Sequence, residues 1–309
     1  MMKQWTLALL AALTLVLTAC GAPAAENTTQ GSYVTVTDDN GRTVTFDKKP
    51  ERIVVTSASF IAPLYAVGGE IVGRPVTKSK VLPEAESAAT IGPVYQIDAE
   101  KIIALTPDLV ILNKGMNEKL IETLAANNIQ TLVIDMKSYE DVKREVATFA
   151  ALTGEKAKGD ELIQKMDADI EAVRSSIPQE KKRISIIHST GQGLSVQLDG
   201  SIAGSIAKML GWENTASGMP ALDKNPDAAP YSMETLVAQN PDIIFVTSMG
   251  EEAEIRASME AMFAESPAWQ SVSAIRDGRV YYLPQEMFLF SPGIDYPKAV
   301  GYMARLVYP

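Results

Sequence analysis

The sequence has few of the side chains from which metal sites and disulfides are built. Its 309 residues include one cysteine, Cys20, and one histidine, His188. A lone cysteine has no second thiol to pair with, so the chain has no internal disulfide and no site of several thiolates. Imidazole is the usual nitrogen ligand of Zn²⁺, so a single histidine disfavours capture of a bare metal ion. We interpret His188, in the apolar stretch RISIIHS, chiefly as a residue at a strand end, with a ligand contact as the alternative.

A long membrane-spanning run is also missing. The apolar run at residues 7–17 is well short of the ~20 residues that a spanning helix needs. With Lys3 before it, the run is typical of a secretory signal over residues 1–19. Leu17-Thr18-Ala19-Cys20 resembles the bacterial lipobox, which implies lipidation of Cys20, although an ordinary signal with an incidental cysteine is the alternative. We therefore expect an extracytoplasmic protein anchored to the membrane by lipid through a flexible tether at residues 20–31.

Positive charge is scarce: the chain has 28 Lys and Arg residues against 38 Asp and Glu residues, which gives a formal net charge of -10. Such a surface does not suit a nucleic-acid partner and is repelled by anionic head groups. The usual catalytic motifs are also absent: the chain has no G-x-S-x-G, no H-E-x-x-H and no G-x-x-x-x-G-K-[ST]. We therefore expect no catalytic residues, no enzyme activity and no intrinsic cofactor, with a lipid-anchored α/β enzyme or a lipid-anchored adhesin as the alternatives.

What the chain does contain is a repeated unit. EKIIALTPDLVIL begins at Glu100 and ETLVAQNPDIIFV begins at Glu234, and in each the glutamate lies seven positions before a Pro-Asp pair. Proline ends a helix before it, and an uninterrupted apolar run predicts a strand covered on both faces. Each copy therefore predicts a short helix, a turn and a buried strand. Two copies predict two similar lobes with the functional site between them.

The remaining pattern predicts an α/β fold with mostly parallel sheets. A hairpin from Tyr33, with its turn at residues 39–41, precedes predicted strands at 52–56, 108–112 and 129–134 and helices at 60–67 and 117–126. Residues 139–177 are helical with a break at 153–154, and we interpret the second part as one helix bridging the lobes. Further strands are predicted at 183–189, 243–247 and 280–284, and further helices at 202–210, 231–239, 252–264 and 295–306. The expected domains are a lobe at 32–152, a connecting helix at 153–178 and a lobe at 179–309.

Several of these features occur together in one known family. TVTDDNGRTVTF followed by KPERIVV, the repeated unit, the central helix and DGRVYYLP together resemble the helical-backbone solute-binding proteins of bacterial ABC importers. Those proteins deliver ferric siderophores, haem or cobalamin. The resemblance implies a monomer with two Rossmann-like lobes joined by one long helix, a ligand cleft between them and a permease dimer with its ATPase as partner. It also implies that Glu100 and Glu234 dock on the permease; stabilisation of a helix N-terminus is the alternative role for both acids.

The ligand site is expected in loops at the carboxyl ends of the strands. The candidates there are aromatic, thioether-rich and slightly cationic: Tyr95, Lys114, Met116, Met136, Lys137, Tyr231, Met249, Met287, Phe288 and Phe290. Such a lining suits a large, flat ligand with negative groups, although core packing is the alternative for any one methionine or phenylalanine.

The resemblance leaves the identity of the ligand open. Haem receptors of this type would place axial ligands at Tyr95 and Met249, a tyrosine-methionine couple that is unusual. A ferric siderophore would use Lys114 and Lys137 against its negative charge, with Tyr95 and Tyr231 stacked on it. Cobalamin would use the same aromatic side chains. We therefore expect iron already chelated by a siderophore or a porphyrin, with cobalamin as the alternative.

Overall fold

The computed structural model describes residues 31–77, 80–191 and 193–309. The predicted signal, Cys20 and almost all of the predicted tether lie outside the described residues. The chain divides into two units, Met1–Gly31 and Ser32–Pro309, and the second unit contains all the helices and strands described below. None of the helices in the described part of the chain is both long and apolar enough to cross a membrane.

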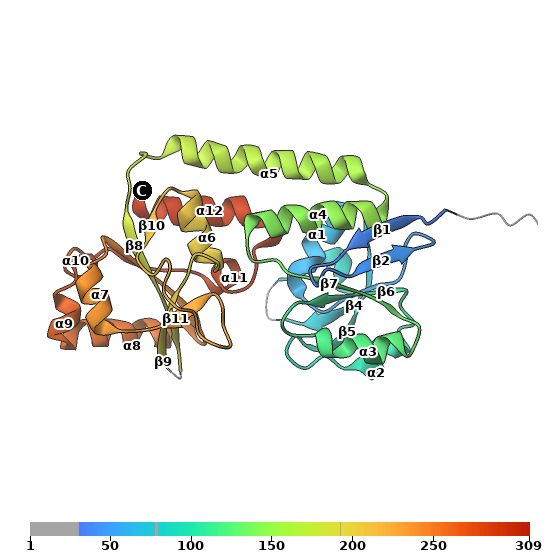
Figure 1. Cartoon of the computed structure of the whole chain (residues 1–309), viewed down its shortest axis with the longest axis horizontal. Helices are drawn as coiled ribbons and strands as arrows, with labels where there is room; N and C mark the ends of the chain where they lie inside the picture. The colour runs from blue at the N-terminus through green and yellow to red at the C-terminus, as the bar shows by residue number, and fades with distance from the viewer. Residues whose placement is uncertain (1–30, 78–79, 192) are drawn as a thin grey trace, which may run out of the picture. The chain divides into compact units, whose positions relative to one another are not determined.

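The first lobe is built on a parallel sheet of five strands in the order β5-β4-β3-β6-β7 (Figure 1). Its strands are β3 (Ile53–Val55), β4 (Ile71–Val76), β5 (Ala89–Pro93), β6 (Leu109–Asn113) and β7 (Gln130–Ile134), after a hairpin of β1 (Val34–Thr37) and β2 (Thr43–Phe46). Its helices are α1 (Ile61–Ala66), α2 (Ala99–Ala104), α3 (Ile121–Ala125) and α4 (Tyr139–Thr153), with short 3₁₀ helices η1 (Ala58–Phe60), η2 (Pro83–Ala85) and η3 (Glu118–Leu120). The hairpin and the predicted strands are confirmed, and β4 and β5 are additional.

The second lobe has a mixed sheet in the order β11-β9-β8-β12-β13, with β10 paired to β8. Its strands are β8 (Arg183–Thr190), β9 (Gly193–Gln197), β10 (Glu213–Asn214), β11 (Ala228–Pro230), β12 (Ile243–Met249) and β13 (Val280–Tyr282). Its helices are α6 (Ile202–Met209), α7 (Met233–Gln239), α8 (Glu252–Glu265), α9 (Pro267–Gln270), α10 (Ser273–Arg276), α11 (Gln285–Phe288), η4 (Gly293–Asp295) and α12 (Tyr296–Val307). β8, β12 and β13 are parallel as expected, whereas β9 and β11 run antiparallel.

The central strands are buried on both faces, as their apolar runs predict. Ile53 and Val55 pack into one core cluster, while Val54 between them packs into a second. In the second lobe Phe245 joins the first cluster and its neighbour Ile244 joins a third. Because successive strand residues point to opposite faces, each sheet separates two apolar layers.

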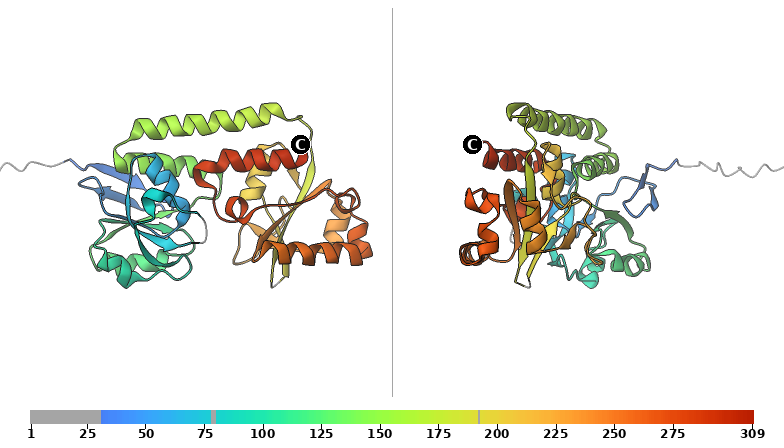
Figure 2. Two further views of the ribbon diagram at one scale, coloured as in Figure 1. Left: turned by 180° about the vertical axis from the view of Figure 1, so that it is seen from behind. Right: turned by 60° about the vertical axis from the view of Figure 1, so that its left-hand side comes forward.

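A long helix connects the two lobes. α5 (Lys156–Ser176) has 21 residues and is therefore about 32 Å long at 1.5 Å per residue. It packs against α4 and α12, and Figures 1 and 2 show it running over both helices. Its buried Met166 and Ile170 belong to the same core cluster as residues of both sheets. The lobes thus share one continuous core on the side of α5, and the predicted bridging helix is confirmed.

The repeated Pro-Asp pair has the same structural role in both lobes. The Asp108 carboxylate accepts hydrogen bonds from the backbone N–H groups of Glu51 at 2.9 Å and Arg52 at 3.0 Å. The Asp242 carboxylate accepts one from the backbone N–H of Arg183 at 2.9 Å. Each aspartate also donates its own N–H to the carbonyl of that arginine. The repeat therefore fastens the start of β6 to β3 and the start of β12 to β8.

Candidate functional site

The carboxyl ends of the first-lobe strands are joined by hydrogen bonds between loops. The sheet reverses its order between β3 and β6, and such a switch point is where open α/β sheets bind ligands. Thr56 Oγ1 donates to the carbonyl of Ile111 at 3.2 Å and accepts from the N–H of Asn113 at 3.0 Å. Asn117 Nδ2 donates to the carbonyl of Val94 at 2.9 Å, which connects the loops after β6 and β5. The scaffold of this edge is therefore held in place without any ligand.

The loop after β7 carries Lys137 to the facing lobe. Ser138 begins α4 with a capping box, because its hydroxyl accepts from the N–H of Asp141 and its own N–H donates to the Asp141 carboxylate at 2.9 Å. Burial would raise the pKa of Asp141, but the hydrogen bonds from Ser138 and Arg144 hold it below the usual range. This cap fixes the backbone beside Lys137, whose Nζ lies 2.8 Å from Oδ2 of Asp227 in the second lobe.

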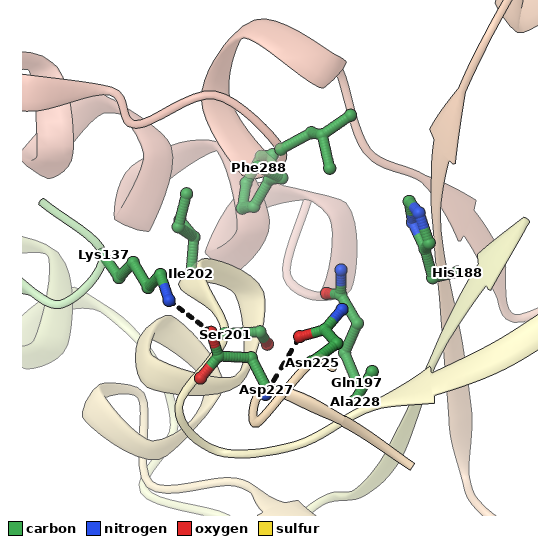
Figure 3. Close-up of a pocket in the computed structure, with 10 residues that line it drawn as sticks. Lys137, His188, Gln197, Ser201, Ile202, Asn225, Asp227, Ala228 and Phe288 are labelled. Carbon is green, nitrogen blue, oxygen red and sulfur yellow. Dashed lines mark hydrogen bonds and ion pairs between the residues drawn. The ribbon is translucent and has the colours of Figure 1, made fainter. Parts of the chain in front are cut away.

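A pocket of about 150 Å³ lies beside this ion pair (Figure 3). It combines polar side chains with an apolar side formed by Ile202, Ala228, Phe288 and Leu289, and its polar members are Lys137, His188, Gln197, Ser201, Asn225 and Asp227. Lys137 comes from the first lobe and the others from the second. The pocket thus lies where the two lobes meet. Among the described residues, no three His, Cys, Asp or Glu side chains gather in a group that could hold a metal ion.

His188 lines this pocket, so its alternative role as a ligand contact gains support. Its Nδ1 lies 3.0 Å from the Thr247 hydroxyl, on the strand paired with its own. Burial lowers the pKa of His188, so the ring is neutral at physiological pH. In the tautomer that donates from Nδ1 to Thr247, Nε2 carries the lone pair. That is the form in which imidazole binds a metal centre.

The two predicted lysines both have partners in the protein. Burial alone would lower the pKa of Lys137, but its hydrogen bond to Asp227 and the nearby charges of Asp135 and Asp141 raise it. Lys114 Nζ donates to the carbonyl of Asp39 in the β1–β2 turn at 2.8 Å. Both ammonium groups therefore have hydrogen-bond partners, and the charge of Lys137 is paired with the Asp227 carboxylate.

Four of the predicted aromatic and thioether residues are exposed rather than packed. Tyr95 is 74% exposed, Met249 55%, Met116 52% and Phe290 47%. They follow or end the strands β5, β12 and β6 and the helix α11, so all four lie on loops where such elements finish. Exposed apolar side chains of this size have no packing role in the described residues. None of the four lines the pocket itself.

The other predicted residues pack in the protein. Met136 is buried, and Met287 packs at the edge of the same core cluster. Tyr231 stacks on Trp269 with ring centroids 5.8 Å apart, and its hydroxyl donates to the sulfur of Met233. Phe288 is also buried, yet it lines the pocket. Of the ten predicted ligand residues, the pocket therefore brings together Lys137 and Phe288.

The sequence analysis missed the polar residues contributed by β9, β11 and the start of α6. Gln197 and Asp227 belong to this group, as do Ser201 and Asn225. The two glycines at 191 and 193 directly after an apolar strand are a turn signal that could have revealed a returning strand. Nothing in the local pattern distinguishes Asp227 from other loop aspartates.

Comparison with known proteins is consistent with this architecture. Residues 53–287 match the sequence profile of the family described as periplasmic binding proteins. The uncharacterized ABC transporter substrate-binding lipoprotein YvrC of Bacillus subtilis is 26% identical over 322 residues, covering 99% of this chain and 96% of the relative. The high-affinity heme uptake system protein IsdE of Staphylococcus aureus is 23% identical over 260 residues, covering 83% of this chain and 87% of IsdE.

Two solved structures have the same fold. The structure of S. aureus IsdE complexed with heme matches with a TM-score of 0.72 at 20% identity, covering 84% of this chain and 99% of that one. The structure of S. aureus SirA complexed with staphyloferrin B also has a TM-score of 0.72, at 18% identity, covering 89% and 98%. At these identities the likeness shows that the chain shares the fold of both structures.

Proposed function

We propose that this chain, which belongs to the family of periplasmic binding proteins, captures a bulky iron chelate between its lobes and delivers it to the permease of an ABC importer. The observation that carries the proposal is the inter-lobe pocket, which Lys137 of the first lobe and residues of the second lobe line together. Four large apolar side chains at the ends of strands or helices are also exposed, and loops on a rigid scaffold commonly carry binding residues.

The size of the pocket defines how such a ligand would sit. Ligand pockets for drug-sized molecules measure about 300–1,000 Å³. The pocket here measures about 150 Å³, so it holds one part of a bulky chelate rather than the whole molecule. The remainder of the ligand would rest on Tyr95, Met116, Met249 and Phe290, whose exposed faces have no partner within the described residues.

Haem is the chelate that the site supports best. His188 is neutral and lines the pocket, and the tautomer that donates from Nδ1 to Thr247 has the Nε2 lone pair available for an iron centre. Tyr95 and Met249 remain proposed axial ligands, and their exposure leaves both side chains accessible. IsdE, named for heme uptake and solved with heme, supports the proposal by likeness.

Titration of the purified protein with haemin tests this proposal. We expect haemin to produce a sharp Soret band with the wild-type protein. The variants His188→Ala, Tyr95→Ala and Met249→Ala are titrated separately, and replacing a residue that binds the iron should lower the apparent haemin affinity at least about tenfold. Tyr33→Ala is the matched control, because Tyr33 is exposed but bonds the carbonyl of Leu152 on another part of the lobe. Absence of a Soret shift in the wild-type protein would exclude haem.

A ferric siderophore is the second candidate. Lys137 in the pocket favours it, because the ammonium can face an anionic chelate, and SirA with staphyloferrin B has the same fold. Quenching of tryptophan fluorescence by a ferric siderophore, with no response to haemin, would select this candidate. A response to cobalamin alone would select the third.

The proposal includes the partners and the cellular location. Glu100 and Glu234 are both exposed in the first turn of their helices, α2 and α7. The side chains of Asp98 and Ser232 cap these helices by accepting hydrogen bonds from backbone N–H groups of the first turn. Each glutamate lies two residues after its cap, so the two glutamates occupy equivalent positions in the two lobes. Matched acids of this kind suit a permease made of two subunits. We also propose that Cys20 carries the lipid anchor, that residues 1–19 are removed and that the lobes span 32–152 and 179–309.

A further inference from the structure

The pocket is closed on one side by an ion pair between the lobes. Lys137 follows β7, and Asp227 immediately precedes β11, with 2.8 Å between Nζ and Oδ2. The other ion pairs among the described residues lie within one lobe, within the α5 segment or between α4 and α5. This pair therefore differs from the rest, because separating the lobes at the pocket breaks it.

Gln197 presents an unsatisfied amide to the same pocket. Its side chain is 8% exposed, and its Oε1 has no hydrogen-bond partner among the described residues. Figure 3 shows the Gln197 side chain directed into the pocket beside Asn225. Buried polar side chains nearly always have a partner, so an orphaned amide aimed into a pocket indicates a missing ligand group.

The neighbouring polar groups already have partners. The Ser201 hydroxyl donates to the carbonyl of Leu198 at 2.8 Å and accepts from the N–H of Gly204 at 3.0 Å. The side-chain carbonyl of Asn225 accepts from the N–H of Asp227 at 3.1 Å. Besides His188, which is proposed to face the iron, Gln197 and the exchangeable Lys137 are thus pocket groups available to a polar arm of the ligand.

We propose that Lys137 and Gln197 bind one carboxylate arm of the cargo, and that Asp227 occupies Lys137 until this arm arrives. The inference rests on the proposed function. The arm's carboxylate accepts from the Lys137 ammonium group. A hydroxyl on the arm donates to Gln197 Oε1, or the amide rotates by 180° and donates from Nε2 to the carboxylate. A water molecule occupies about 30 Å³ of liquid, so a pocket of about 150 Å³ suits a short polar arm.

The exchange is feasible because the resident ion pair is accessible to water. The Lys137 and Asp227 side chains are 46% and 24% exposed. Ion pairs with this access to solvent contribute little to stability. Asp135 and Asp141 keep the lysine positively charged while it changes partner. Asp227 therefore competes with the cargo for Lys137 and repels the incoming carboxylate.

Two sources share this chemistry, namely a haem propionate and a carboxylate of a hydroxy-carboxylate chelate. The probes are haemin, haemin dimethyl ester, ferric citrate and iron-free citrate. Haemin binding that depends on Lys137, with no such dependence for its dimethyl ester, identifies the propionate. Ferric citrate binding that depends on Lys137 identifies the hydroxy-carboxylate.

Affinities of four variants test the assignment. For the probe that binds, Asp227→Asn should tighten binding about two- to fivefold, because it removes a weak competing ion pair. Lys137→Met should weaken binding at least about tenfold, and Gln197→Leu should weaken it about two- to tenfold. Glu265→Gln removes one negative charge from an exposed position in the same lobe and should leave affinity unchanged. Equal or weaker binding by Asp227→Asn would overturn the proposal.

Iron-free citrate separates this inference from the proposed function. It carries the arm without the metal, and NMR should show shifts at Lys137 and Gln197 that disappear in Lys137→Met. Citrate shifts without binding of any iron chelate would keep the subsite and reject the proposed cargo. Chelate binding with no citrate shifts and no effect of Lys137→Met would reject the subsite and keep the cargo.

Discussion

Glu145 is a buried acid without a partner. It lies on α4, is 1% exposed, and neither of its carboxylate oxygens has a hydrogen-bond partner among the described residues. Burial raises its pKa well above the usual range, the negative charges of Asp39 and Asp141 raise it further, and Arg144 opposes them. Because its pKa is higher in the folded than in the unfolded chain, its stabilising contribution is complete below about pH 4.3 and is lost as the pH rises.

We predict that Glu145→Met stabilises the protein at neutral pH. The substitution removes a buried, unsatisfied acceptor, which is worth about 1–3 kcal/mol in the free energy of unfolding. Urea unfolding of both proteins between pH 4 and pH 8 measures the effect. The advantage of the variant should shrink as the pH falls and Glu145 becomes protonated. An advantage that stays constant across this range would show that the charge of Glu145 is not its cause.

At the scale of the element, the repeated Pro-Asp pair aligns neighbouring strands. Asp108 accepts two backbone hydrogen bonds from the chain entering β3, and Asp242 accepts one from the chain entering β8. We predict that Asp242→Ala lowers the free energy of unfolding by about 1–2 kcal/mol and that Asp108→Ala lowers it by more. Chemical denaturation measures both. Asp108→Asn keeps a side-chain carbonyl and should recover part of the loss; no recovery would assign the role to charge instead.

Elements with continuous apolar runs could be predicted from sequence, and interrupted ones could not. The runs at β6 and β12 predicted strands correctly, because both faces of those strands are buried. β4 contains Gly73 and Pro75, and β5 contains Gly92 and Pro93, residues that weaken a strand signal. A Cβ at Gly73 would lie 2.7 Å from Leu105 Cδ1 and 3.0 Å from Val54 Cγ2, so a larger residue there would displace these side chains. Tertiary packing thus created strands that local pattern does not indicate.

The site was predicted in part for the same reason. Lys137 follows β7, where parallel topology places ligand loops, and Lys137 and Phe288 are the predicted residues that line the pocket. Gln197 and Asp227 reach the pocket through the antiparallel strands β9 and β11, which the βαβ pattern does not require. Lys114 was assigned to the ligand because it directly follows β6 at the carboxyl end of the strand. In the structure its ammonium group donates to the carbonyl of Asp39 in the β1–β2 turn.

At the scale of the whole molecule, the proposed delivery to a permease uses a glutamate on each lobe. We predict that Glu100→Lys combined with Glu234→Lys reduces uptake at least about tenfold. Docking through acidic side chains requires positive charge on the permease, and lysines at these positions would repel that charge. Cargo affinity should be unchanged, since neither residue lines the pocket. Asp160→Lys with Glu161→Lys on α5 is the matched control, because it changes net charge equally on exposed positions of a helix between the lobes. Uptake assays and purified-protein titrations together measure the effect; normal uptake would remove these glutamates from the docking surface.

The core cluster shared by both lobes also joins distant parts of the sequence. α12 is the last helix, yet its buried Tyr296, Val300 and Met303 belong to the cluster that α4 and α5 complete from the middle of the sequence. A nascent chain that has emerged only as far as α5 leaves this apolar surface open to water. The cluster is therefore complete only when α12 packs against α5, so the two halves of the sequence form this part of the core together.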